Sequence, residues 1–187
     1  MSQVERIRRQ QVLREVEGYL ELLMVFHHDW PVAPSLRDPL VRRALAILDD
    51  MGSAGAHLAH ALYLRGQALR VAEQWNDAIA PLAQAAELEP QNTAHWLALA
   101  WCQKRVGRVD LAIQALEEAL AADAEQAIVH YNLACYWALQ QNVSLAVEYL
   151  ARAFDIDPKY RDLVKDERDF DGIRHHPGFR AVTKVSV

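Results

Sequence analysis

The feature that most constrains the fold of this chain is an internal repeat of constant length. Three consecutive segments, 59–92, 93–126 and 127–160, carry residues of the same kind at the same positions. The shared columns hold small or aliphatic residues: Gly66, Ala100 and Ala134; Ala78, Ala112 and Ala146; Ile79, Ile113 and Val147; Leu82, Leu116 and Leu150; Ala85, Ala119 and Ala153. A sixth column, Asn76, Asp110 and Ser144, holds types that cap helix starts. The three segments therefore fold alike, each with a helix starting at this column.

The composition indicates that the repeated unit is helical. Ala and Leu are abundant, only 7 Gly and 7 Pro occur among 187 residues, and no alternating Val, Ile and Thr pattern indicates strands. Small residues at the eighth, twentieth and twenty-seventh positions of each repeat let neighbouring helices approach closely. An all-α fold follows.

This pattern resembles the tetratricopeptide repeat (TPR), a helix-turn-helix module of about 34 residues. The middle segment matches the family best, with Trp96 and Ala100 in the columns where the family has Trp and Gly, and Gly107 in the turn between the helices. The outer segments depart from the family at the Trp column, where they carry Leu62 and His130. The resemblance implies an α-solenoid of stacked helical hairpins.

The flanks of the repeats are predicted to be helical as well. Residues 1–56 are expected to form an N-terminal helical hairpin that packs on the array at 57–160, with one helix over 3–28 and a second from Pro39 to about Met51, capped by Asp38. Residues 161–187 are expected to form a C-terminal capping segment, with one capping helix and a short tail helix. This tail resembles those that follow TPR arrays in prokaryotic proteins, which suggests a bacterial source.

Charge and cysteine content restrict the class of partner and the compartment. A net charge of −5 disfavours binding to nucleic acid or to an anionic membrane surface. Cys102 and Cys135 lie in apolar stretches and are too few for a disulfide framework. With no apolar leader at the start and no run of 18 apolar residues, the chain is expected to be soluble and cytoplasmic.

No pattern of residues points to catalysis. The chain lacks GxSxG, Walker, HExxH, CxxC and glycine-rich dinucleotide motifs. Six histidines occur in three close pairs: His27 and His28, His57 and His60, His175 and His176. The sequence places no third metal ligand beside any of these pairs. We therefore expect no enzyme activity, no cofactor and no metal, with a small metal-dependent enzyme as the rival reading.

The family resemblance implies a binding surface on the first helix of each repeat, at its second, fifth, ninth, twelfth and thirteenth positions. These five positions in three repeats give fifteen residues, and none of them is acidic, although the repeat region as a whole is acidic. The predicted groove residues are His60, Tyr63, Gln67, Arg70, Leu97, Trp101, Lys104, Arg105 and Tyr131, with Asn132 at a sixth position. Aromatic and basic side chains of this kind suit a protein or peptide partner with apolar anchors and acidic groups.

We therefore predict a non-catalytic scaffold or adaptor that binds a partner segment in the concave groove. Two alternatives stay open. A chaperone of the bacterial type III secretion kind has a similar plan, and its N-terminal helix would form a homodimer. In the other, a terminal helix of the chain fills the groove.

Overall fold

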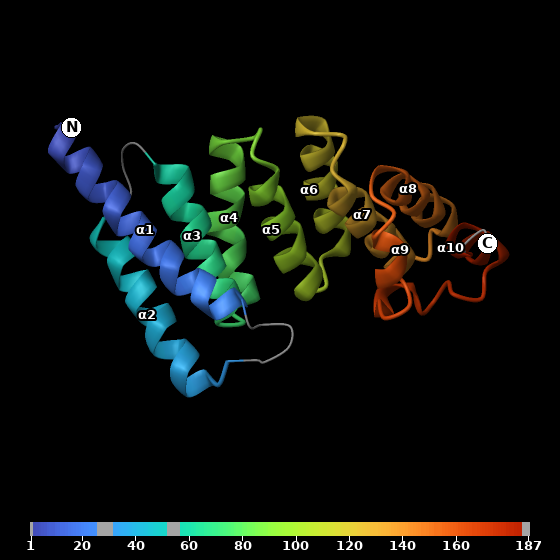
Figure 1. Ribbon diagram of the computed structural model, residues 1–187, viewed down its shortest axis with the longest axis horizontal. Helices are drawn as coiled ribbons and strands as arrows, with labels where there is room; N and C mark the ends of the chain where they lie inside the picture. The colour runs from blue at the N-terminus through green and yellow to red at the C-terminus, as the bar shows by residue number, and fades with distance from the viewer. Residues whose placement is uncertain (1, 26–31, 52–56, 185–187) are drawn as a thin grey trace. The chain divides into compact units, whose positions relative to one another are not determined.

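A computed structural model describes residues 2–25, 32–51 and 57–184, and Figure 1 shows these as helices joined by turns. Among these residues there is no β-strand, which confirms the all-α prediction. They form two compact units, Met1–Glu89 and Pro90–Val187.

The first unit contains four helices, of which the first three share one apolar core. The four helices are α1 (Gln3–Val25), α2 (Pro34–Asp50), α3 (Leu58–Val71) and α4 (Trp75–Leu88). Helix α1 packs against both α2 and α3, as Figure 1 shows. Their buried residues form one cluster: Leu13, Val16, Leu20, Leu23, Val41, Ala44, Leu48, Leu64, Ala68 and Val71. Four apolar residues of α1, Leu13, Val16, Leu20 and Leu23, are therefore covered by its neighbours within the unit.

Helix α2 begins earlier than the sequence suggested. The predicted start at Pro39 with Asp38 as the cap is wrong, because the helix begins at Pro34 and Pro39 lies inside it. Proline is well accommodated in the first turn of a helix, where its missing N–H has no partner to lose. Either proline could begin a helix under that rule, so the sequence offers no means of choosing between them; in the structure Pro34 occupies the first turn and Pro39 lies beyond it. Asp38 pairs with the Arg37 guanidinium at 2.9 Å instead.

The hairpin of α3 and α4 shows why the first repeat has glycine where the other two have Ala100 and Ala134. A Cβ on Gly66 would lie 2.4 Å from Cγ of Leu82 on the facing helix. Leu82 is completely buried, so it has little room to move. The close approach of the two helices thus requires the absence of a side chain at this position.

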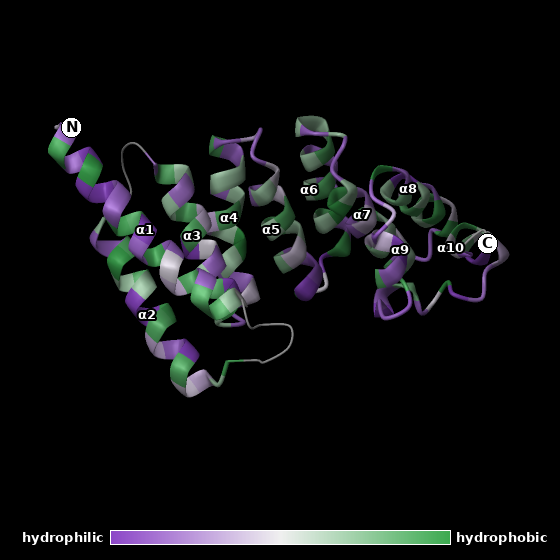
Figure 2. Cartoon of the chain, in the orientation of Figure 1, coloured by the Kyte–Doolittle hydropathy of each residue, from purple (hydrophilic) through white to green (hydrophobic). Residues whose placement is uncertain are grey.

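The second unit contains two further hairpins, α5 (Thr93–Arg105) with α6 (Val109–Ala122) and α7 (Ala127–Leu139) with α8 (Val143–Ile156). Helices α4, α6 and α8 begin at Trp75, Val109 and Val143, which occupy the same position in the three repeats. The small residues Ala100, Ala112, Ala134 and Ala146 are completely buried. In the hydropathy colouring of Figure 2, α8 is mainly hydrophobic, whereas α1 alternates between hydrophobic and hydrophilic patches.

The prediction that Asn76, Asp110 and Ser144 cap helices is wrong by position. Helices α4, α6 and α8 begin one residue before each of them, so they lie inside the first turn. Of the residues before these three helices, only Asn142 caps with its side chain, accepting a hydrogen bond from the Leu145 N–H at 3.2 Å. Polar and acidic residues are favourable throughout the first helical turn, so the composition alone does not fix the capping residue.

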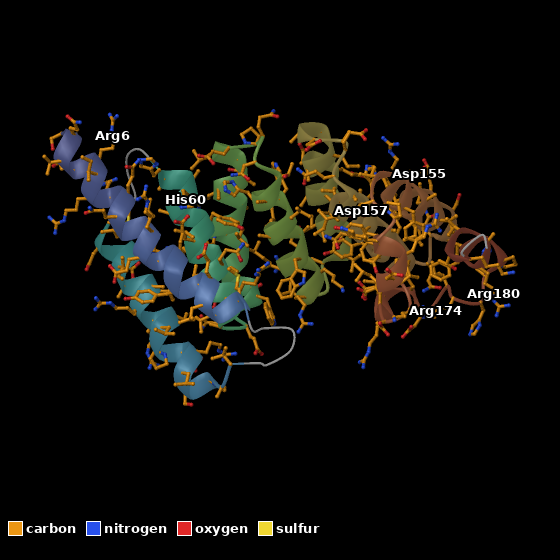
Figure 3. All side chains as sticks on the ribbon, in the orientation of Figure 1. Arg6, His60, Asp155, Asp157, Arg174 and Arg180 are labelled. Atoms are coloured by element: carbon orange, nitrogen blue, oxygen red, sulfur yellow. The ribbon has the colours of Figure 1, made fainter. Side chains whose placement is uncertain are left out.

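The tail of the second unit contains three short elements rather than the predicted capping helix and tail helix: α9 (Tyr160–Leu163), the 3₁₀ helix η1 (Arg168–Phe170) and α10 (Pro177–Thr183). Arg174, labelled in Figure 3, joins the end of α9 to the start of η1 by donating to the carbonyl oxygens of Val164 and Glu167 at 3.0 and 2.6 Å. The element η1 packs on α7, and α10 packs on α8. The tail thus covers parts of both helices of the last hairpin.

None of the helices in residues 2–25, 32–51 and 57–184 combines the length and the apolar content needed to cross a bilayer.

Candidate binding surface

The four predicted groove residues of the first unit lie on α3, and at least two of them contact α1. His60, labelled in Figure 3, has its Nε2 atom 2.8 Å from a carboxylate oxygen of Glu17. The Arg70 guanidinium lies 3.6 Å from the sulfur of Met24. Tyr63 packs against the core cluster described above. The N-terminal helix therefore already occupies part of the surface that was predicted to bind a partner.

Gln67 is the fourth of these residues, and its side chain is 4% exposed. Its Oε1 atom is buried and has no hydrogen-bond partner among the residues that the structure describes. A buried acceptor of this kind is unfavourable by about 1–3 kcal/mol. In this structure the residue belongs to the interior of the unit.

In the second unit, the tail covers the middle of α7 and the end of α5. The Lys104 ammonium lies 2.6 Å from a carboxylate oxygen of Asp169 on η1. The ring of Tyr131 packs against Tyr160 at a centroid distance of 5.1 Å and edge-on against Phe170 at 5.9 Å. Tyr131 is consequently only 5% exposed. The structure thus places an acidic and an aromatic side chain of the same chain on two predicted groove residues.

The tail also encloses Cys135, which follows Tyr131 by one helical turn on α7. The Cys135 sulfur and carboxylate oxygens of Glu167 and Asp169 all lie within 4.8 Å of one another. Burial raises the pKa of the Cys135 thiol well above its ordinary value, and the two carboxylates raise it further. Because Asp169 is already paired with Lys104, this group has the features of a packed tail contact.

Three predicted groove residues of the second unit form a stripe on α5 that we call the α5 stripe: Leu97, Trp101 and Arg105. Their spacing of four residues places them on one side of the helix. Leu97 and Trp101 are partly buried, and Arg105 is exposed. The Arg105 guanidinium lies over the Trp101 ring, 5.6 Å from its centroid. The α5 stripe therefore presents an apolar surface with a positive charge at one end.

Asn132 and two further residues of α7 belong to the inner positions of the third repeat. Asn132 is partly buried. Ile128 and Leu139 are 43% and 39% exposed, although both are large and apolar. They were among the fifteen inner positions but were not predicted as site residues. Ile128 and Leu139 could have been predicted as site residues, because each is an apolar residue at a position that the family uses for binding.

The histidines do not come together as ligands within the described residues. His57 and His60 line a shallow pocket with residues of α1, and His60 is paired with Glu17. His176 accepts a hydrogen bond from the Gly178 N–H through Nδ1 and so caps α10. His27 and His28 lie outside the described residues. Within the described part of the chain, the group around Cys135 is the one set of three metal-ligating side chains that lie close together.

Comparisons with known proteins agree with the helical hairpins. Residues 69–134 match the family model described as tetratricopeptide repeat. No curated protein sequence matches the chain.

Several solved structures share the fold at low sequence identity. A crystal structure of MamA is 18% identical with a TM-score of 0.66, over 78% of this chain and 84% of that chain. MamA 41-end from Desulfovibrio magneticus RS-1 is 20% identical with a TM-score of 0.59, over 90% and 93% of the two chains. YrrB, described as a TPR protein with an unusual peptide-binding site, is 20% identical with a TM-score of 0.62, over 86% of each chain.

These structures have the fold of TPR α-solenoids, which confirms the predicted fold class. With the family match over residues 69–134 and the equal spacing of the starts of α4, α6 and α8, the conclusion is that residues 69–134 carry the tetratricopeptide repeat pattern and that the chain has the fold of a TPR α-solenoid.

Proposed function

We propose that this protein is a non-catalytic adaptor and that its second unit binds a partner segment along the α5 stripe. The TPR fold supports a protein–protein interaction scaffold, and the similar protein YrrB is described as having a peptide-binding site. We keep 59–92, 93–126 and 127–160 as the proposed repeat boundaries.

One observation carries the proposal for the chemistry of the partner. Next to the α5 stripe, the chain's own tail docks with the Asp169 carboxylate on Lys104 and the Phe170 ring on Tyr131. The tail is thus an internal example of an acidic and aromatic segment on this surface. A partner segment with the same combination would place an apolar side chain on Trp101 and a carboxylate beside Arg105.

The expected contributions of the α5 stripe follow from its composition. Trp and Arg are the residue types that most often dominate protein interfaces, and truncating such a residue typically weakens binding by more than about 1 kcal/mol. Lys104 and Tyr131 are unsuitable as probes because changing them would also disturb the tail that covers them. Trp101 and Arg105 contact each other on α5 and are the better probes.

The experiment compares four forms of the full chain as baits in extracts of the native source: wild type, Trp101→Ala, Arg105→Glu and Lys159→Glu. Lys159 is exposed and supplies the same change of charge away from the α5 stripe. We expect a protein retained by wild type and by Lys159→Glu and lost from the other two, with a drop in affinity of about fivefold or more on titration of the purified pair. Equal retention by all four folded baits would reject the α5 stripe.

The cytoplasmic location, the bacterial source and a homodimer through α1 remain predictions from the sequence. A chaperone role for a secreted client is the alternative function, and it differs by requiring an obligate client that is exported.

A further inference from the structure

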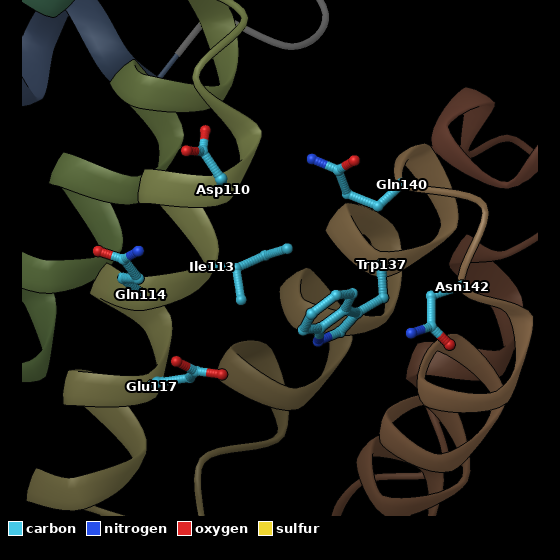
Figure 4. Close-up of a pocket in the computed structure, with 7 residues that line it drawn as sticks. All are labelled: Asp110, Ile113, Gln114, Glu117, Trp137, Gln140 and Asn142. Atoms are coloured by element: carbon cyan, nitrogen blue, oxygen red, sulfur yellow. The ribbon is translucent and has the colours of Figure 1, made fainter.

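A pocket of about 470 Å³ lies between α6 and α7 of the second unit, and no step of the proposed function uses it. Figure 4 shows the side chains that line it. Four come from one side of α6, and the others from the end of α7 and the turn after it: Asp110, Ile113, Gln114, Glu117, Trp137, Gln140 and Asn142. Its size is in the range of pockets that hold a side chain or a small ligand, about 300–1,000 Å³.

This pocket is separate from the inner face of α7. Trp137 and Gln140 follow Tyr131 by six and nine residues, which at 3.6 residues per turn places them roughly 240° and 180° around the helix. Tyr131 and Cys135, under the tail, face a different direction. A ligand in the pocket would therefore leave the α5 stripe and the tail untouched.

The pocket carries negative charge that no cation among the described residues balances in an ion pair. Asp110 and Glu117 are both exposed, and neither takes part in an ion pair within the described residues. Asp110 has a structural explanation, since a carboxylate in the first turn of α6 is favourable. No such structural explanation applies to Glu117. The equivalent residues of the other two repeats are Ala83 and Ala151. The fold does not need an acid at this position.

Trp137 gives the pocket an aromatic wall. Its repeat position holds Leu69 and Gln103 in the other two segments, so an indole here is also peculiar to this pair of helices. Figure 4 shows Ile113 pointing toward the indole and the Glu117 carboxylate on the side of the ring that carries the nitrogen. The Nε1–H group is buried and has no hydrogen-bond acceptor among the described residues. An indole beside a carboxylate is an arrangement that attracts a guanidinium or ammonium group.

We propose that this pocket binds a basic segment of a partner protein, with an arginine side chain stacked on Trp137 and paired with Glu117. A rise of 1.5 Å per residue separates Glu117 from Asp110 by about 10 Å along α6, too far for one guanidinium to pair with both. A segment in the polyproline II conformation rises about 3.1 Å per residue with three residues per turn, so side chains three positions apart lie on one side of it, about 9 Å from each other. The segment therefore carries two basic residues three positions apart, and the side-chain amides of Gln114 and Gln140 are available for its backbone.

The test uses a fluorescein-labelled peptide with two arginines three positions apart in a glycine–serine background, titrated with the full chain. The same peptide with citrulline in place of both arginines removes the charge and keeps the shape. We expect saturable binding of the arginine peptide and at least tenfold weaker binding of the citrulline peptide. The indole N–H signal of Trp137 in a ¹H–¹⁵N spectrum should shift on titration.

Matched variants separate the pocket from general attraction to an acidic chain. Glu117→Ala should weaken binding about tenfold, and it introduces the residue that the other two repeats already carry. Glu118→Ala makes the same change of charge on the neighbouring exposed residue of α6, outside the pocket, and should leave affinity within twofold. Trp137→Phe should weaken binding less than Trp137→Leu.

Equal losses for Glu117→Ala and Glu118→Ala, or equal binding of the arginine and citrulline peptides, would overturn the proposal. Failure of this test leaves the α5 stripe unaffected, because the partner proposed there is acidic and contacts other side chains.

Discussion

Replacing Gly66 with alanine tests the packing argument on which the hairpin fold depends. The new Cβ would lie 2.4 Å from Cγ and 2.5 Å from Cδ2 of Leu82. Carbon atoms pack at about 3.5–4.0 Å, so the two helices would have to separate or Leu82 would have to leave its rotamer. Leu82 is completely buried, and neither adjustment is easy.

The expected magnitude follows from two opposing effects. Overpacking a close helix contact costs about 1–3 kcal/mol, and a contact this short belongs near the upper end. Alanine returns about 1 kcal/mol because it is a better helix former than glycine. The Gly66→Ala protein should therefore lose about 1–2 kcal/mol of unfolding free energy.

Gly18 provides a matched control for the same substitution. It is an exposed residue inside α1, and a Cβ there would meet no atom within 4 Å. Gly18→Ala should gain about 0.5–1 kcal/mol from helix propensity alone. The two proteins should thus shift in opposite directions in urea unfolding followed by circular dichroism.

A double substitution then identifies the clash itself. Leu82→Ala alone should cost about 2–5 kcal/mol through the cavity it leaves. Combined with Gly66→Ala it should cost less than the sum of the two, because the added methyl group finds space. If Gly66→Ala were as stable as wild type, or if the two substitutions were additive, the close-packing explanation of the repeat glycine would be wrong.

Two further predictions concern the tail of the second unit. Lys104→Met should lower the unfolding free energy by about 1–3 kcal/mol and speed hydrogen exchange over residues 160–184, because it leaves the mostly buried Asp169 carboxylate without its cation. The control Lys159→Met should change neither quantity. Unchanged exchange in both variants would show that the ion pair does not hold the tail. Burial raises the pKa of Cys135 and of Tyr131 above their ordinary values of 9.0 and 10.0, so the stability that these groups contribute is complete below pH 9 and is lost as pH rises further. The midpoint of urea unfolding, measured at pH 7, 9 and 10.5, should therefore fall above pH 9. A constant midpoint would contradict the burial of these groups.

The periodic residues explain how much of the fold the sequence could predict. Ala78, Ala112 and Ala146 recur at the same position of each repeat and are all completely buried, because a solenoid repeats the same helix contact at the same phase. Helix starts were less predictable, as Pro34 and Pro39 show, since in the sequence either could begin a helix under the same local rule.

The sequence could not predict which of the candidate site residues the tail covers. Asp169 lies 65 residues from its partner Lys104 and is one of several acids in the tail. Periodicity says nothing about which of them reaches α5, because the contact depends on the path of a non-repeating segment. The same reason explains Tyr131, which has the right repeat position for a binding residue and is buried by Tyr160 and Phe170.

The most direct test of the proposed binding surface is a ¹H–¹⁵N spectrum of the tryptophan indole groups during titration with a purified partner. Trp101 lies on the α5 stripe, whereas the indole N–H of Trp96 donates to the Pro90 carbonyl oxygen at 3.0 Å and serves as an internal reference on the same helix. We predict that the Trp101 signal shifts in step with binding and that the Trp96 signal stays in place. A partner that binds fully while Trp101 does not move would contradict the assignment of the α5 stripe.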